Sequence, residues 1–138
     1  MGAVTTFNSD LRAIERDPVT LVFEVVADLG ATSSSEEVLA AMPAGVTYLY
    51  AEVQCIIAEA GATSSKCNLK HGSTTFFTGS ADNGGTVDTI DEGVSSGTFD
   101  PTADTSAAGN LIADIDVVGT STTAAKWRII VTCLRTSF

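Results

Sequence analysis

The stretch KWRIIVTCL, residues 126–134, decides the expected fold. Its apolar side chains recur at every second position, which is the pattern of a β-strand with one buried face. Aromatic and β-branched residues of this kind favour extended chain over helix. The predicted core face consists of Trp127, Ile129, Val131 and Cys133. We therefore expect this stretch to close a β-domain.

A second apolar run, VTLVFEVVADL at residues 19–29, is the first clear strand of the chain. The run is almost continuously apolar, which predicts burial on both of its faces. A subunit contact on the second face is one way to achieve that burial. Since this run and residues 126–134 both have the character of central strands, we expect the two ends of the chain to meet in one sheet.

A third strand is predicted at residues 46–60, VTYLYAEVQCIIAEA. Its expected core face consists of Leu49, Ala51, Val53, Cys55 and Ile57. Tyr48 and Tyr50 then share the opposite face. A tyrosine pair on a strand can stack on sugars or bases, although filling a second core or a subunit interface is its more common role. We predict that both tyrosines bind a partner.

Shorter strands complete the predicted domain, and Gly, Pro, Ser and Asn turn signals separate them. Residues 79–110 are the richest in such signals and have room for two short strands. The further strand candidates are residues 36–42 (or one helical turn), 65–70, 74–78, 86–90, 94–99 and 111–118. Six to eight strands with little helix predict an all-β fold: one antiparallel β-sandwich or jelly-roll-like domain over residues 18–138.

Residues 1–17 are predicted to form an N-terminal arm. Phe7, Leu11 and Ile14 lie at i, i+4 and i+7, which is the spacing of a short helix that Pro18 would end. So short a helix is marginal in isolation, so we expect the arm to be either docked on a neighbouring molecule or partly mobile. These three apolar residues are its predicted anchors.

The formal net charge of −10 excludes the usual nucleic-acid binders. Such proteins need Lys and Arg to neutralise phosphates, yet residues 71–125 contain neither. The same acidity predicts repulsion from anionic membranes. The sequence also contains no apolar run of signal-peptide or transmembrane type, so we expect synthesis in the cytoplasm and no membrane partner.

No catalytic, metal or cofactor site is predicted, and the protein is not expected to be an enzyme. His71, in the segment KHGST, is expected to lie in an exposed turn rather than to act as a base. Cys55, Cys67 and Cys133 form no CxxC pair and are expected to be buried apolar side chains. Calcium at Asp88, Asp91 and Glu92 is an alternative, but turn chemistry explains these residues as well.

The order of these segments resembles small structural proteins of tailed phages. The resemblance covers about residues 19–134, and in it Met42 replaces the commoner Leu and GSADNGG replaces a Gly-Asp turn. The matching segments are VTLVFEVV (19–26), MPAGVTYLYAEVQCII (42–57), GATSSKCNLKHG (61–72), TGSADNGGTVDTI (78–90), LIADIDVVG (111–119) and AKWRIIVTCL (125–134).

What this resemblance implies is a capsid decoration, or cement, protein. Such proteins are β-sandwich or jelly-roll domains, often trimers, that bind the major capsid protein on the outer surface of the virion. They are made in the host cytoplasm. Two alternatives stay open at this point. One is a tail, neck or fibre adaptor that binds its partner through residues 79–110, and the other is a carbohydrate-binding module that uses Tyr48, Tyr50 and the acidic loops.

Overall fold

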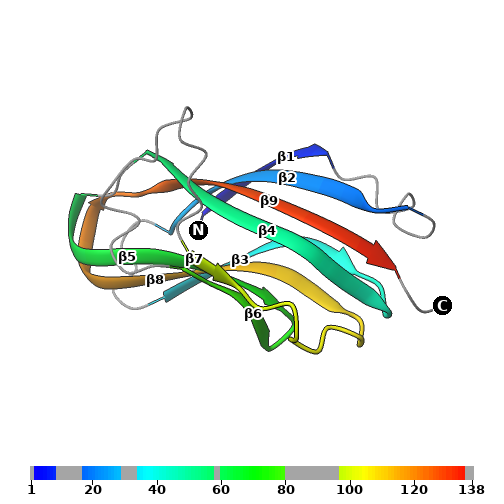
Figure 1. Ribbon diagram of the computed structural model, residues 1–138. Coiled ribbons are helices and arrows are strands. Elements are labelled where there is room, and N and C mark those ends of the chain that lie inside the picture. Colours follow the sequence, from blue (N-terminus) through cyan, green and yellow to red (C-terminus); the bar gives the residue numbers. More distant parts are fainter. Residues whose placement is uncertain (1, 9–16, 29–33, 58–59, 80–96, 136–138) are drawn as a thin grey trace.

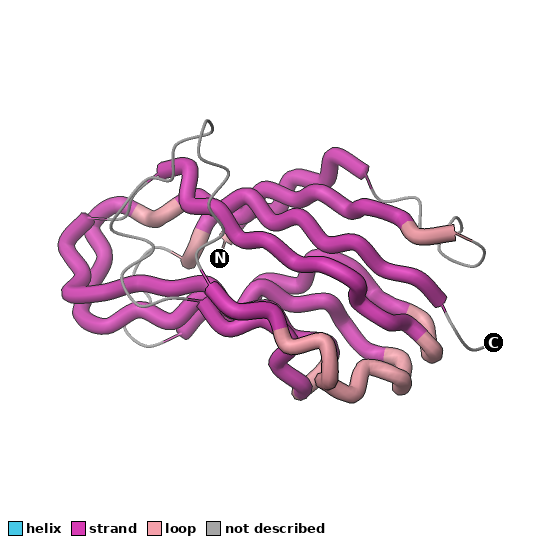
Figure 2. Tube along the Cα trace, viewed as in Figure 1, coloured by secondary structure: helices cyan, strands magenta, loops and turns pink. Residues whose placement is uncertain are grey.

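Nine β-strands and no helix occur in the residues that the computed structural model describes, which are 2–8, 17–28, 34–57, 60–79 and 97–135 (Figures 1 and 2). The strands are β1 (Ala3–Asn8), β2 (Val19–Val26), β3 (Ser34–Met42), β4 (Val46–Ile57), β5 (Ala60–His71), β6 (Thr74–Gly79), β7 (Gly97–Phe99), β8 (Gly109–Thr123) and β9 (Lys126–Arg135).

The strands form two antiparallel sheets that pack face to face (Figure 1). The four-stranded sheet has the order β1-β2-β9-β4, and the five-stranded sheet has the order β3-β8-β5-β6-β7. The predicted all-β sandwich is therefore confirmed. The predicted meeting of the two chain ends is also confirmed, because β2 pairs with β9 along its whole length, from Val19 opposite Cys133 to Val26 opposite Lys126.

The core lies between the inner faces of the two sheets. All four predicted core residues of β9 are fully buried, and so are Leu111, Ala113 and Ile115 on the central strand β8. The inner face of β2 adds Leu21, Phe23 and Val25, none of which is exposed. The three cysteines are buried and free, as predicted. The uninterrupted alternation in β8 and β9 thus assigned each side chain to the correct face, whereas the outer face of β2 is only half-buried in the single chain.

Strand β4 departs from its predicted pattern. Its register with β9 shifts between Tyr48 and Tyr50, so Leu49 is an extra residue in a β-bulge. A one-residue insertion exchanges the two faces, so Tyr48 enters the core. A second shift lies between Cys55 and Ile57. The prediction that Leu49 and Ile57 belong to the core is therefore wrong, because both are about half exposed.

The N-terminal segment forms a strand where a helix was expected. β1 pairs with β2, with Val4 opposite Val25, and forms one edge of the four-stranded sheet. The prediction of a helix is therefore wrong at Phe7. A short isolated helix is only marginally stable, and the free edge of β2 offers backbone hydrogen bonds to an extended segment instead. Leu11 and Ile14 lie outside the described residues. The boundary of the arm at residue 17 stays a prediction.

The turn before β4 and two of the short strands follow the sequence signals, whereas the turn signals at 61–65 and 119–123 lie within β5 and β8. Gly45 ends the predicted turn before β4 with a φ of 81°, a left-handed conformation that glycine adopts without strain. Residues 36–42 belong to a strand, β3, and β7 falls within the predicted strand at 94–99. The strand predicted at 86–90 lies outside the described residues.

A pair of substitutions in β9 tests which of its faces is the core. Ile129→Ala removes a fully buried side chain and is expected to lower the free energy of unfolding by about 2–5 kcal/mol. Ile130→Ala, at the next residue and on the outer face, is the matched control and is expected to lower the free energy of unfolding clearly less. Urea unfolding of both variants measures the difference. Equal losses would contradict the assigned faces.

Candidate partner-binding site

The structure separates the residues that were predicted to bind a partner. Phe7 on β1 and Tyr50 on β4 are exposed, with 59% and 46% of their surface accessible. Tyr48 is buried at 4% exposure. Leu11 and Ile14 lie outside the described residues. The prediction that Tyr48 and Tyr50 share one face is therefore wrong, while partner binding by Phe7 and Tyr50 stays a prediction.

Tyr48 belongs to an aromatic cluster between the two sheets. Its ring stacks on Phe76 of β6, with ring centres 4.1 Å apart and planes 9° from parallel. Its hydroxyl lies 2.9 Å from Nδ1 of His71 at the end of β5. Burial raises the pKa of Tyr48 above its ordinary value, so this hydroxyl stays protonated and donates to the imidazole. Tyr48 thus joins the two sheets.

His71 is buried, so the prediction of an exposed turn histidine is wrong. Its Nε2 contacts the carbonyl oxygen of Ala107, and a carbonyl can only accept a hydrogen bond. Nε2 therefore carries a proton and donates it, which leaves Nδ1 as the acceptor for Tyr48. Both ring nitrogens are used by the protein itself. The sequence signal for this pair was weak because its members lie in different strands.

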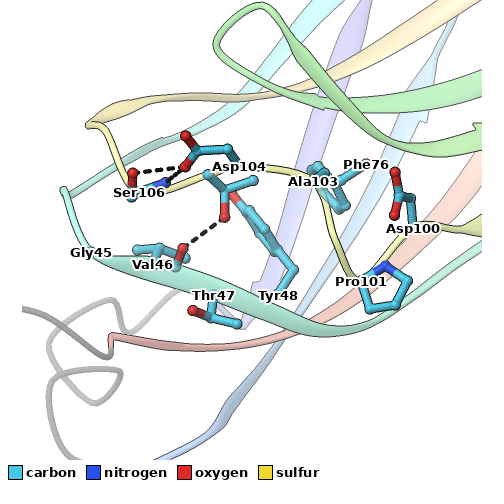
Figure 3. A pocket seen from close by; sticks show the side chains of 11 residues that line it. Gly45, Val46, Thr47, Tyr48, Phe76, Asp100, Pro101, Ala103, Asp104 and Ser106 are labelled. Atoms are coloured by element: carbon cyan, nitrogen blue, oxygen red, sulfur yellow. Dashed lines mark hydrogen bonds between the residues drawn. The ribbon is translucent and has the colours of Figure 1, made fainter.

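A hollow of about 220 Å³ lies next to Tyr48, between the start of β4 and residues 100–106 (Figure 3). Thr105 donates through its hydroxyl to the carbonyl of Val46 at 2.7 Å, and the amide of Gly45 donates to the carbonyl of Ser106 at 2.7 Å. These bonds attach the β7–β8 connection to the four-stranded sheet. A second hollow, of about 270 Å³, lies between residues 71–74 and residues 104, 107 and 108 of this connection.

The acidic groups at these hollows stabilise their own turns. Asp100 accepts from the hydroxyl and the amide of Thr102, and Asp104 accepts in the same way from Ser106. These hydrogen bonds lower the pKa of both carboxyls. Each is a local Asx-type turn, which explains the DPTADTS sequence without a ligand. We therefore assign the hollows a structural role.

The described part of the chain contains no group of three or more His, Cys, Asp or Glu residues that suits a metal ion. The acids considered for calcium, Asp88, Asp91 and Glu92, lie outside it. Burial raises the pKa of Cys133 to about 11 and that of Cys67 still further. Thiols of this kind are poor nucleophiles, because only the thiolate reacts. No helix in these same residues is long and apolar enough to cross a membrane.

The outer face of the four-stranded sheet has an apolar centre. Val22 and Ile130 lie opposite each other on β2 and β9 and are half-buried. In the next row the hydroxyls of Thr20 and Thr132 share a hydrogen bond of 3.0 Å, and Tyr50 lies beside Thr132 on β4. The exposed face of an antiparallel sheet is usually polar. An apolar, threonine-rich face is suited to contact with another protein, because few charges must be desolvated.

One ion-pair cluster borders this apolar centre. Glu24 on β2 lies 2.9 Å from Lys126 Nζ and 3.1 Å from Arg128 Nη2, both on β9. The bonds to Lys126 and then Arg128 lower the pKa of Glu24. One carboxylate and two cations leave a single positive charge at this border of an otherwise acidic protein.

The outer face of the five-stranded sheet is charged instead. Lys70 on β5 pairs with Glu36 on β3 at 2.9 Å, across the intervening strand β8. Asp114 and Asp116 project from β8, and partial burial followed by repulsion from Asp116 raises the pKa of Asp114. Asn68 donates to Asp116 at 3.0 Å. This face has the character of a solvated surface, in contrast to the four-stranded sheet.

Large exposed apolar side chains gather at the edges of the four-stranded sheet. Among the described residues, five of the seven such side chains lie on its two edge strands β1 and β4. They are Val4, Phe7, Leu49, Tyr50 and Ile57. The other two, Val38 and Val118, lie on the five-stranded sheet. We take the outer face and the two edges of the four-stranded sheet as the candidate partner-binding site.

Comparison with known proteins shows the fold. The sequence matches no protein-family model and no curated protein. A chain of the solved structure of the cyanophage Pam1 capsid asymmetric unit is similar in fold, with a TM-score of 0.54 and 18% sequence identity. The match covers 85% of this chain and 84% of that one, so it spans the sandwich as a whole rather than one sheet.

Tyr48→Phe tests the buried contact between the sheets. The change removes the donor to His71 Nδ1 and leaves a buried acceptor unpaired, so we expect a loss of about 1–3 kcal/mol in the free energy of unfolding. Tyr50→Phe is the control, because it removes only an exposed bond to Glu52 and should change stability by less than about 0.5 kcal/mol. Chemical denaturation decides, and two equal effects would speak against a buried Tyr48.

The ion pairs of Glu24 predict an acid-dependent stability. Its pKa is lowered in the folded state from an ordinary 4.5, so its contribution is present above that pH and is lost as the pH falls towards the folded value. Glu24→Gln should therefore reduce the difference in urea midpoint between pH 7 and pH 3. Glu52→Gln is the charge-matched control, because it removes the same charge from a carboxylate that accepts a hydrogen bond from the Tyr50 hydroxyl. A Glu24→Gln profile identical to wild type would refute the assignment.

Proposed function

We propose that this protein is a structural, non-enzymatic component of a tailed-phage particle, and more specifically a decoration protein that binds the major capsid protein on the outside of the shell. The observation that supports this most is the likeness of the whole sandwich to a chain from a cyanophage capsid. The segment layout of the sequence leads to the same class of protein. Its place would be the virion surface, after synthesis in the host cytoplasm.

The contrast between the two outer faces supports this role. The outer face of the four-stranded sheet offers Val22, Ile130 and Tyr50, whereas the outer face of the five-stranded sheet carries Glu36, Lys70, Asp114 and Asp116 among its apolar side chains. We propose that the apolar face contacts the shell and that the charged face remains in solvent. The net charge of −10 suits an external position, because it disfavours contact with the packaged genome.

The proposed mechanism is one of binding energy alone. A protein that bridges neighbouring shell subunits buries surface only in the assembled state, so its binding shifts the equilibrium towards the intact shell. Four strands about 4.8 Å apart and about eight residues long present roughly 500 Å². That area is below the ~800 Å² per partner of a standard interface, so stable attachment requires several copies or several contacts.

The alternatives have different support. A tail, neck or fibre adaptor would use the same kind of surface and remains the second candidate, with residues 79–110 as its predicted partner-binding loop. The carbohydrate-binding alternative depended on an exposed pair of tyrosines. Because Tyr48 is buried beneath residues 100–106, no such pair exists, and we do not propose this function.

Binding to empty shells of the encoding phage tests the proposal. The purified protein is expected to co-sediment with shells and to raise their disassembly temperature. Ile130→Lys, on the outer face of β9, should weaken binding on the order of tenfold or more, because a charge must then be desolvated. Ile112→Lys is a matched control, since Ile112 is also half-buried on a central strand but faces outward from the other sheet.

Each outcome has a distinct meaning. If the wild-type protein does not bind shells, the decoration role is wrong, and imaging of the protein on the tail or neck would establish the adaptor role instead. If Ile112→Lys loses binding while Ile130→Lys keeps it, the shell contacts the charged face and the proposed orientation is wrong.

A further inference from the structure

We infer that copies of this protein join head to tail through the edges of the four-stranded sheet, with β1 of one copy beside β4 of the next. This inference names a second copy of the chain as a partner. It goes beyond the proposed function and does not require the shell. It follows from strand direction, from the distribution of charge and from the exposed apolar side chains on the two edges.

The strand directions permit this contact between β1 of one copy and β4 of the next, the β1–β4 joint, without rearrangement of either copy. The four-stranded sheet is antiparallel throughout, in the order β1-β2-β9-β4, so its two edge strands run in opposite directions. Figure 1 shows β1 and β4 running in opposite directions, so when a second sheet continues the first in the same plane, β1 of the new copy lies antiparallel to β4 of the old one. The ladder then continues in the more stable antiparallel geometry. Each added copy offers another β4 edge, so rings or longer arrays follow.

The scarcity of charged residues on β1 and β4 favours these two edges as the contact between copies. The chain has a net charge of −10, so two copies repel each other except where charge is scarce. The sequence of β1, AVTTFN, has no charged residue, and that of β4 has only Glu52. The edges of the five-stranded sheet are protected in recognised ways: β7 has three residues, and β3 contains Glu36 and Glu37. The edge strands β1 and β4 are longer than β7 and poorer in charge than β3, although each contains a β-bulge.

The inner and outer faces of the two edge strands also match. Val4 lies opposite the buried Val25, so it points to the inner face, as Val53 does on β4. An antiparallel joint that places Val4 opposite Val53 keeps inner residues beside inner residues. The same register brings the exposed Phe7, which is the extra residue of a bulge in β1, opposite the exposed Tyr50, and an aromatic cross-strand pair of this kind is favourable.

The length of the joint predicts a weak association. Residues 3–7 against 50–54 give about five residue pairs, or roughly 17 Å of ladder. Such a joint is small compared with a stable interface, so the purified protein should be monomeric when dilute and should form oligomers as its concentration rises. On a repeating surface that holds copies side by side, the same joint becomes effectively intramolecular and much stronger.

Two substitutions that each block one edge test the inference. Phe7→Lys blocks β1 and Tyr50→Lys blocks β4, and both reduce the net negative charge, so general repulsion cannot explain a loss of association. Sedimentation velocity from about 10 μM to 1 mM is expected to show that each variant alone associates on the order of tenfold more weakly than wild type. Val118→Lys is the matched control, because Val118 is 57% exposed, close to the 59% of Phe7, but lies on the five-stranded sheet.

The decisive sample is an equimolar mixture of the two variants. Phe7→Lys retains β4, and Tyr50→Lys retains β1, so the mixture should form one-to-one dimers that grow no further. Circular dichroism confirms that both variants are folded.

A wild-type protein that stays monomeric at 1 mM would overturn the inference. Loss of association in Tyr50→Lys alone would also overturn it, since that result indicates two β4 edges paired about a two-fold axis. Because shell binding is probed by Ile130→Lys and self-association by Phe7→Lys, failure of one proposal is distinguishable from failure of the other.

Discussion

The pairing of β2 with β9 is the contact on which the rest of the structure depends. Thr20 and Thr132, which face each other across it, are 112 residues apart in sequence, so the pairing closes almost the whole chain. Closing so long a loop costs conformational entropy before any contact is gained. That cost is offset by the inner faces of the two strands, where Phe23 lies opposite Ile129 in the fully buried core. Once the pair exists, β1 and β4 can join its outer sides and become the sheet edges.

The cohesion of the two sheets depends on a bulge as well as on apolar packing. Without the extra residue at Leu49, Tyr48 would face outward and His71 would lose its hydrogen-bond donor. With it, one end of the sandwich is joined by the Tyr48–His71 bond and by the attachment of residues 100–106 to β4. The cost is that Leu49 and Tyr50 become exposed side by side on an edge strand. A feature that stabilises the interior therefore also creates an apolar surface.

Much of the fold could be predicted from sequence because the alternation in β8 and β9 is unbroken, and an unbroken alternation has only one assignment to faces. The same reasoning failed in β4, because a single bulge exchanges the inner and outer faces of the strand. The bulge places Tyr48 against Phe76 and His71, which lie on other strands and are not visible in the local sequence pattern. The reasoning failed at Phe7 because a short helix is only marginally stable, whereas pairing with β2 gives the same segment the hydrogen bonds of a sheet. The buried His71 could not be found locally, since Tyr48 and Ala107 are its partners only in the folded chain.

The unprotected edges of the four-stranded sheet have a physical cost that argues for their use. A β-sheet edge with exposed apolar side chains and almost no charge is a hazard for uncontrolled pairing, which proteins usually avoid with charges or short strands. This chain uses both devices on the five-stranded sheet, whereas β1 has no charged residue and β4 has only Glu52. The acidic composition of the chain supplies the compensation, since a net charge of −10 opposes the approach of two copies. A short joint opposed by this repulsion is weak in solution, and it becomes strong only where another surface fixes the copies next to one another.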